Sequence, residues 1–384
     1  MTNSRLNNYY RKLKHEWSMW THRRSLQRKL DTMQGWISQQ QRQPAEVLVG
    51  PNCAQFGGVR HHIHAIQQYC QSRVQLAPSN RAMQTLQIYD LETQFRDVWF
   101  AYEAAGVNVL HSHVYPWYID WCRERKEKSG IKWVHTYHAN YYPECETNGL
   151  QDWQQEINNS LIHIAPHADI RLSVSKWQVN YLRDTYGIES EYLANGVDVE
   201  LSQQANPDRF RRIHELTDFV LYVGRNDSVK NPREFVQLAQ HLPELNFVMI
   251  GQGLDHLALK DDWGNEVPSN VTMVGALPQQ KVQDAIAASS AVVVTSRREG
   301  LPTLVMEAMA NKKPIVVPDE PGCVEVTAGE ECGYIYQPGN IQDLASQTRL
   351  ALADSKIGSR GYQRVLKEYD WRVVGKQLDA VYRR

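Results

Sequence analysis

Ser296-Arg-Arg-Glu-Gly-Leu-Pro-Thr-Leu-Val-Met-Glu-Ala-Met-Ala310 is the stretch that decides the fold of this chain. It follows the apolar run 291–295, which is short, β-branched and uncharged, as is typical of a strand buried on both faces of a parallel sheet. Pro302 suits the first position of a helix, because its missing N–H would have no partner there anyway. The stretch therefore predicts a strand, a loop and a helix, the unit of an open α/β sheet whose ligands bind where strands end.

Two carboxylates flank the predicted helix start. Glu299 lies in the loop and Glu307 lies on the second turn of the helix. The free backbone N–H groups of a helix N-terminus favour a phosphate, and carboxylates accept hydrogen bonds from sugar hydroxyls. A phosphate beside a polyol indicates a nucleotide sugar. Two glutamates at this spacing would by themselves be an ordinary solvated helix face, but the preceding strand and the intervening Gly-Leu-Pro favour a binding site.

The segment from Glu299 to Glu307 resembles the Glu-x7-Glu motif of retaining glycosyltransferases of the GT-B fold, in particular family 4. The resemblance implies two Rossmann-like domains that face each other across a cleft. It assigns the donor sugar to Glu299 and the ribose hydroxyls of the nucleotide to Glu307. The donor-binding residues at the helix start would be Gly300, Leu301, Pro302 and Thr303.

Length and composition agree with a two-domain α/β protein. The chain has 384 residues and a formal net charge of -1, which gives no overall attraction to nucleic acid or to anionic membranes. Its six cysteines form no Cys-x-x-Cys pair, and reduced thiols are expected. The absence of a long apolar run or a signal-peptide pattern predicts a cytoplasmic protein that neither spans a membrane nor is secreted.

Residues 1–45 are predicted to form a helical arm outside the α/β units. Residues 1–43 carry nine basic and two acidic side chains, with aromatic and aliphatic residues between them. This mixture is typical of a peripheral helix on anionic lipid at the inner face of a membrane. A helical hairpin packed on the core or on a partner subunit is the alternative.

Residues 46–200 are predicted to form the first Rossmann-like domain, which would bind the acceptor. Strands are expected at 46–50, 85–89, 107–110, 132–136 and 168–174, with helices at 60–69 and 116–128. Gly57 and Gly58 follow the first strand, where paired glycines let a backbone approach a ligand closely. By the resemblance, these glycines lie beneath the donor diphosphate, and His138 faces the donor sugar with His113 as its neighbour.

Aromatic and histidine residues of this domain leave alternatives open. Acceptor sugars could stack on rings such as Tyr141 and Trp117, or these rings could be ordinary core residues. His61, His62 and His64 invite comparison with a metal site, but no carboxylate accompanies them, and surface or packing roles are favoured. No metal or other cofactor is predicted.

Residues 201–365 are predicted to form the second domain, after a polar linker at 199–216. Arg225 and Lys230 follow its first strand, and both could reach one diphosphate, as in the Gly-Arg-x4-Lys element that this segment resembles. Val274 and Gly275 would lie beside the nucleobase, as in relatives. The final helix, 366–384, is expected to cross back onto the first domain.

The combined prediction is a retaining transfer of a hexose from a UDP- or GDP-linked donor to a hydroxyl of a glycan, lipid-linked or small-molecule acceptor. Arg225, Lys230 and the helix start would stabilise the leaving diphosphate. No residue stands out as a covalent nucleophile, which favours front-face displacement. The alternatives are a nucleotide-sugar epimerase of the same architecture and an inactive sugar-nucleotide-binding protein.

Overall fold

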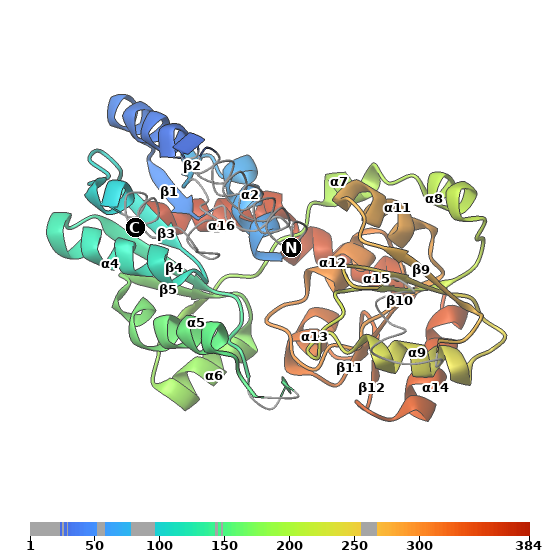
Figure 1. Cartoon of the computed structure of the whole chain (residues 1–384). Helices are drawn as coiled ribbons and strands as arrows, with labels where there is room; N and C mark the ends of the chain where they lie inside the picture. Colours follow the sequence, from blue (N-terminus) through green and yellow to red (C-terminus); the bar gives the residue numbers. More distant parts are fainter. Residues whose placement is uncertain are drawn as a thin grey trace, which may run out of the picture.

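The computed structural model describes residues 24, 27–28, 30–51, 58–77, 97–142, 145–146, 149–254 and 267–384. It contains two parallel sheets of six strands, each flanked by helices, which lie in two domains side by side (Figure 1). The predicted fold class is therefore confirmed. Both sheets have short apolar strands with buried side chains, because helices cover both of their faces.

The first sheet has the strand order β2-β1-β3-β4-β5-β6. Its strands are β1 (Val47–Gly50), β2 (Val74–Leu76), β3 (Val109–Ser112), β4 (Lys132–Tyr137), β5 (Ile170–Ser173) and β6 (Glu191–Tyr192). Its helical elements are α2 (Gly58–Tyr69), α4 (Pro116–Ser129), α5 (Asp152–His163), η3 (Ala165–His167) and α6 (Lys176–Tyr186). Strand β1 lies between β2 and β3, so the strand order changes direction at β1. The start of α2, which follows β1, therefore lies at the carboxyl edge of the sheet.

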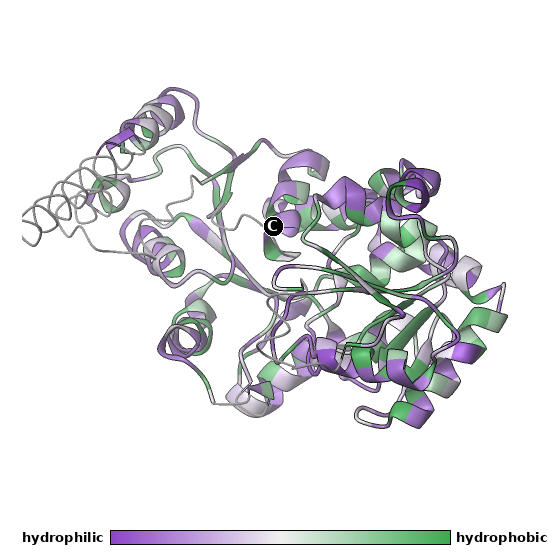
Figure 2. Ribbon diagram, turned by 45° about the vertical axis from the view of Figure 1, so that its right-hand side comes forward, coloured by the Kyte–Doolittle hydropathy of each residue, from purple (hydrophilic) through white to green (hydrophobic). Residues whose placement is uncertain are grey.

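The second sheet has the strand order β12-β11-β10-β7-β8-β9. Its strands are β7 (Val220–Val223), β8 (Phe247–Ile250), β9 (Val271–Gly275), β10 (Ala291–Val293), β11 (Ile315–Pro318) and β12 (Tyr334–Tyr336). Its helices are α7 (Val199–Gln203), α8 (Pro207–His214), α9 (Pro232–His241), α11 (Gln279–Ala288), α12 (Thr303–Ala310), α13 (Pro321–Thr327), α14 (Ile341–Ala353) and α15 (Ile357–Arg364). Figure 2 shows apolar strands of this sheet enclosed between helices with polar outer faces.

Four expectations from the sequence differ from the structure or lie outside it. The segment 199–216 is not an irregular linker, because α7 and α8 form there and bury Val199 and Phe210. Pro302 caps α12 in an extended conformation instead of occupying its first turn. Strand β2 was not predicted, since only three residues form it. The strand expected at 85–89 lies outside the described residues.

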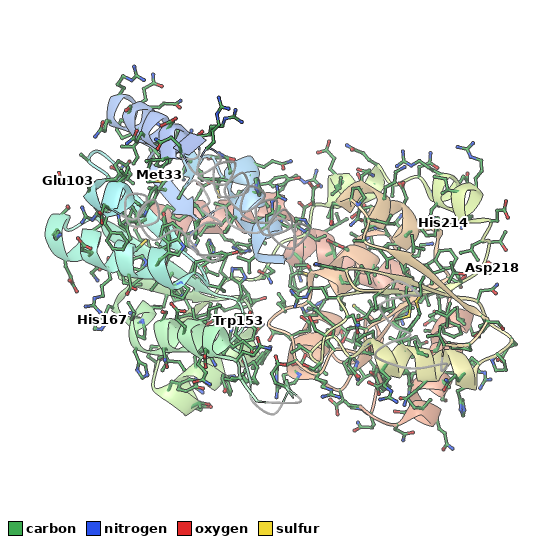
Figure 3. The ribbon with its side chains drawn as sticks, in the orientation of Figure 1. Met33, Glu103, Trp153, His167, His214 and Asp218 are labelled. Atoms are coloured by element: carbon green, nitrogen blue, oxygen red, sulfur yellow. The ribbon has the colours of Figure 1, made fainter. Side chains whose placement is uncertain are left out.

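The described part of the N-terminal arm packs on the first domain. Residues 30–42 are helical, and Leu30, Met33 and Ile37 are buried with the core aromatics around Trp99. The ring of Trp36 stacks on that of Trp99, with centroids 5.7 Å apart. Met33 lies where this helix meets the domain (Figure 3). This segment therefore follows the packed-helix alternative, whereas residues 1–23, the main part of the proposed lipid-binding surface, lie outside the described residues.

The chain passes between the domains twice, near Val197 and near Trp371, and these two segments lie side by side. Val197 donates its N–H to the carbonyl of Tyr369 at 2.7 Å, and Trp371 donates its N–H to the carbonyl of Val197 at 3.2 Å. The chain reaches Trp371 through a π-helical turn, η4 (Val365–Tyr369), and continues as α16 (Trp371–Arg383). The apolar face of α16 is buried in the core of the first domain. None of the helices in the described part of the chain combines the length and the apolarity that crossing a membrane requires.

Candidate active site

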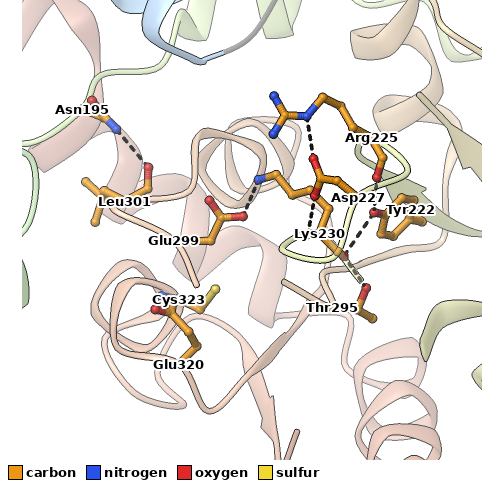
Figure 4. A network of polar contacts seen from close by, with 10 residues as sticks. All are labelled: Asn195, Tyr222, Arg225, Asp227, Lys230, Thr295, Glu299, Leu301, Glu320 and Cys323. Carbon is orange, nitrogen blue, oxygen red and sulfur yellow. Dashed lines mark hydrogen bonds and ion pairs between the residues drawn. The ribbon is translucent and has the colours of Figure 1, made fainter. Parts of the chain in front are cut away.

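The loop between β7 and α9 places basic side chains beside the loop that precedes α12. Lys230 extends from this loop to Glu299, and its Nζ lies 2.5 Å from a carboxylate oxygen of Glu299 (Figure 4). The two side chains are 29% and 14% exposed, so the ion pair is partly shielded from water. Arg225 is more open, with 64% of its side chain exposed. The structure thus brings together Lys230 and Glu299, and leaves the guanidinium of Arg225 accessible to an anion.

Asp227 holds this loop in shape. One oxygen of its carboxylate accepts the N–H of Lys230 at 2.8 Å, and the other accepts Nε of Arg225 at 2.8 Å. The hydroxyl of Thr295 donates to the carbonyl of Lys230 at 3.1 Å. Asp227 was not singled out from the sequence, although an aspartate at a loop start is a common turn-former that bonds to backbone N–H groups nearby. Its charge also helps to orient Arg225 before an anion binds.

The loop before α12 lies directly against the first domain. A Cβ at Gly300 would stand 1.7 Å from the carbonyl oxygen of His138, so only glycine permits this approach. The carbonyl of Gly300 accepts Nε1 of Trp177 at 2.8 Å, and that of Leu301 accepts Nδ2 of Asn195 at 3.0 Å. Three residues of the first domain therefore fix the loop that carries Glu299.

Glu325 makes a second contact between the domains. Its two carboxylate oxygens accept the backbone N–H groups of Lys176 at 2.8 Å and Trp177 at 3.0 Å, the first residues of α6. A carboxylate there satisfies donors that have no partner within their own helix and interacts favourably with the helix dipole. No local sequence pattern links Glu325 to these groups, because its partners lie 149 and 148 residues away.

Glu307 on α12 is hydrogen-bonded to α11, the helix that follows β9. Nε2 of Gln279, the first residue of α11, donates to its carboxylate at 2.9 Å. Burial raises the pKa of Glu307 to about 7, although hydrogen bonds from Gln279 and Gln283 act in the opposite direction. Val274 and Gly275 end β9, and Gly275 has a left-handed backbone with φ of 77°. The predicted base-side and ribose-side residues therefore lie on adjoining elements.

Substitution of Glu307 tests its unusual ionisation. The folded protein holds the carboxyl proton more tightly than the unfolded chain, so protonation stabilises the fold. This contribution is complete below the ordinary pKa of 4.5 and is lost as the pH rises through about 7. In urea unfolding of the wild type and Glu307→Gln, we expect the stability of the wild type relative to the variant to fall by up to about 3 kcal/mol between about pH 5 and pH 8.

Glu330→Gln, on the exposed surface, is the control for that experiment. Its stability difference from the wild type should change little between the same two pH values. An equally flat difference for Glu307→Gln would contradict the buried carboxyl environment described above.

His138 lies at the domain contact, but its side chain turns into a group of buried histidines. Its Nε2 is 3.0 Å from Nδ1 of His113, and its ring meets that of His62 edge to face with centroids 4.6 Å apart. Burial lowers the pKa of His138 to about 4, so its imidazole is neutral at pH 7. The carbonyl of His138 faces Gly300. His113 therefore lies beside His138, as predicted. His62, for which a surface or packing role was favoured, is buried against both rings.

The remaining predicted residues lie partly in the first domain and partly in the second. Gly58 begins α2, and its Cβ position lies 3.9 Å from the hydroxyl of Thr303, so the first loop meets the start of α12. Gly57 lies outside the described residues. Leu301 is buried, and Pro302 and Thr303 start α12. The two rings suggested above as stacking surfaces, those of Tyr141 and Trp117, are partly buried, and the neighbouring rings of Tyr118, Tyr137 and Tyr142 are buried and offer no open face.

Glu320 is a further acidic group beside this site. Its carboxylate accepts the N–H of Cys323 at 3.1 Å and caps α13. Burial raises the pKa of Glu320 to about 7. Nη1 of Arg298 lies 3.6 Å from it. Glu320 could not be selected from the sequence, since a glutamate that caps a helix has no distinctive spacing.

Two facing α/β domains, with basic and acidic side chains meeting at the helix start after β10, define the GT-B class of proteins. The family model described as "Glycosyl transferases group 1" matches residues 205–368, and the model described as "Glycosyltransferase Family 4" matches residues 56–201. The chain belongs to the GT-B glycosyltransferases of family 4.

Individual relatives agree with this assignment. The Alpha-D-kanosaminyltransferase of Streptomyces kanamyceticus is 25% identical over 203 residues, which are 50% of this chain and 53% of that protein. The Sulfoquinovosyl transferase SQD2 of Arabidopsis thaliana is 26% identical over 168 residues, which are 41% of this chain and 32% of that protein. The chain thus spans about half or less of the length of these two relatives.

Solved structures share the fold at low sequence identity. Sucrose-phosphate synthase of Thermosynechococcus elongatus matches with a TM-score of 0.72 and 19% identity, over 88% of this chain and 98% of that chain. Anabaena Alr3699/HepE in complex with UDP and glucose matches with a TM-score of 0.68 and 16% identity, over 88% of this chain and 99% of that chain. At these identities the likeness concerns the fold alone.

Proposed function

We propose that this protein transfers a hexose from a nucleotide-diphosphate sugar to an acceptor hydroxyl, with retention at the anomeric carbon. The observation that carries the proposal is the ion pair between Lys230 and Glu299 at the start of α12. Lys230 is a cation that could bind the diphosphate, and Glu299 beside it is a carboxylate that could accept hydrogen bonds from the sugar hydroxyls. The nucleotide sugar also agrees with the ligands of a structural neighbour, which binds UDP and glucose.

The leaving group is a diphosphate, and negative charge grows on it as the glycosidic bond breaks. Lys230, Arg225 and the backbone N–H groups at the start of α12 would stabilise that charge without reorganising, since Asp227 already holds the basic loop. In this arrangement a donor diphosphate draws Lys230 away from Glu299, and the freed carboxylate accepts hydrogen bonds from the sugar. Glu307 would then bind the ribose. We propose that this stabilisation requires no divalent metal.

Retention follows from a displacement on one face of the sugar. The acceptor hydroxyl would approach from the side that the diphosphate leaves, and the leaving phosphate would help to remove its proton. The contacts of Gly300 with His138 and Trp177 close the cleft around the reacting centre and exclude water from it. The donor would be UDP- or GDP-linked, and the acceptor a glycan, a lipid-linked sugar or a small molecule.

Nucleotide release measured with and without an acceptor separates the proposal from its alternatives. A transferase releases nucleotide diphosphate in proportion to an added acceptor, and NMR of the product should show the anomeric configuration of the donor. An epimerase would convert the nucleotide sugar without acceptor, and an inactive binding protein would do neither. Glu299→Ala should abolish the acceptor-dependent release, whereas an inverted product would refute the retaining mechanism.

A further inference from the structure

The carboxyl edge of the first sheet holds a group of five buried histidines, which are His62, His111, His113, His135 and His138. Three elements supply them. His62 comes from α2, His111 and His113 from the end of β3, and His135 and His138 from the end of β4, which pairs with β3 in parallel. Neither the proposed transfer of a sugar nor the packing of the sheet calls for so many imidazoles in one place.

Two of the five have protein partners that settle their position. His111 bonds through one ring nitrogen to the hydroxyl of Tyr382 at 2.7 Å and through the other to the hydroxyl of Thr136 at 2.8 Å. His135 is held by the hydroxyl of Ser112, 2.8 Å from its Nδ1. His111 is therefore bonded at both ring nitrogens and His135 at Nδ1 only, since Nε2 of His135 has no partner among the described residues.

The other three face one another. His62, His113 and His138 each offer one ring nitrogen, and these nitrogens all lie within 4.8 Å of one another. Nδ1 of His113 and Nε2 of His138 are separated by 3.0 Å. Nδ1 of His62 is buried and has no hydrogen-bond partner among the described residues, whereas the unpartnered Nε2 of His113 is the ring nitrogen that does not face His138. An imidazole nitrogen buried without a partner is costly, and it points to a ligand that the protein chain itself does not supply.

We propose that His62, His113 and His138 bind a divalent transition-metal ion of the zinc class. Zinc binds imidazole nitrogens at about 2.0–2.1 Å in tetrahedral geometry, which sets its ligand nitrogens about 3.4 Å apart. Binding would require the rings to turn until the three nitrogens, which lie within 4.8 Å of one another, reach that spacing. Imidazole ligands suit Zn²⁺, Co²⁺ and Ni²⁺, whereas Mg²⁺ and Ca²⁺ prefer oxygen. The fourth position is left for a water molecule.

The site lies on rigid elements and is covered. The ring of Trp371, from the segment that returns to the first domain, lies 5.0 Å from the ring of His62. A bound ion would therefore join the start of α2 to the ends of β3 and β4 beneath α16. This role is separate from the leaving group, because Lys230 and Arg225 lie on the second domain. The metal would act on the stability of the first domain and on the position of His138.

Metal binding can be measured on the full-length protein without any nucleotide sugar. After treatment with a chelator and dialysis, titration with Co²⁺ should give the visible absorption of a tetrahedral site at one equivalent, and Zn²⁺ should displace it. Calorimetry with Zn²⁺ gives the affinity, and the melting temperature should rise with Zn²⁺ but not with Mg²⁺. A wild-type protein without a one-to-one Zn²⁺ site would overturn the proposal.

His62→Gln is the principal variant, and His61→Gln, the exposed neighbour on the same helix, is its matched control. We expect His62→Gln to weaken Zn²⁺ binding about 100-fold or more and to remove the thermal shift, while His61→Gln binds within about twofold of the wild type. His113→Gln provides the second ligand variant if the first does not fold. Wild-type affinity in a folded ligand variant would also refute the site. Because no sugar donor is present, failure here leaves the proposed transferase function untouched.

Discussion

Replacing Lys230 with alanine is expected to lower kcat/KM for sugar transfer by about 100- to 1,000-fold, because a fixed cation then no longer faces the leaving diphosphate. The loss should appear mainly in kcat, since the charge grows in the transition state. Steady-state kinetics of acceptor-dependent nucleotide release measures it. Glu299→Ala should produce a loss of similar size, because it removes the carboxylate that would accept hydrogen bonds from the donor sugar.

The control is Arg349→Ala, which breaks the pair between Arg349 and Glu244 on the surface of the same domain. Their side chains are 57% and 52% exposed, so both stability and activity should change little. Circular dichroism and thermal melts of each variant show whether the fold is kept. Near-normal turnover in folded Lys230→Ala and Glu299→Ala would reject the assigned site.

Gly300→Ala is expected to hold the cleft open. A Cβ at this position would meet the carbonyl oxygen of His138 at 1.7 Å, and both atoms belong to backbone that cannot rotate away. The two domains must separate by about 1 Å or more, which costs about 100-fold in rate when the reacting groups are displaced as much. The separation also breaks the bond from Trp177 to the carbonyl of Gly300.

Two measurements test the expected effect of Gly300→Ala. Kinetics should show the lower kcat/KM, and small-angle scattering should show a larger radius of gyration. Gly35→Ala is the matched control, because a Cβ there meets nothing within 4 Å. Gly35 lies in the helical segment 30–42, so alanine should keep activity and raise the unfolding free energy by about 0.5–1 kcal/mol. Unchanged activity and scattering in Gly300→Ala would contradict the close contact between the domains.

The residues of the candidate site could be selected from the sequence where the pattern that marks them is local. Arg225 and Lys230 follow a strand, and Glu299 and Glu307 flank a helix start, so each pair could be found within a single strand-loop-helix unit. The structure brings Lys230 to Glu299, although these residues are 69 positions apart and the sequence did not predict their contact. The parallel order of β7 and β10 explains this result, because adjacent parallel strands end at the same edge of the sheet.

Other parts of the site depend on contacts that no short pattern records. Asn195, Trp177 and Glu325 connect the domains through hydrogen bonds to backbone groups, one each from Asn195 and Trp177 and two to Glu325. Glu320 acquires its raised pKa from burial beneath α13, which depends on packing. The linker prediction for 199–216 failed for a related reason. Two short helices there gain their stability from the neighbouring core, and isolated helices of this length are marginal.

The sequence alone determined the α/β class, the two parallel sheets and the position of the acidic and basic loops. Apolar runs, glycines and prolines act over a few residues, so their consequences are visible in the order of the chain. Only the tertiary structure decided that the loop at Gly300 rests on His138 and that His62 joins His113 and His138. Those neighbours come from separate segments, and the order of strands and the packing of α2 against them bring the side chains together.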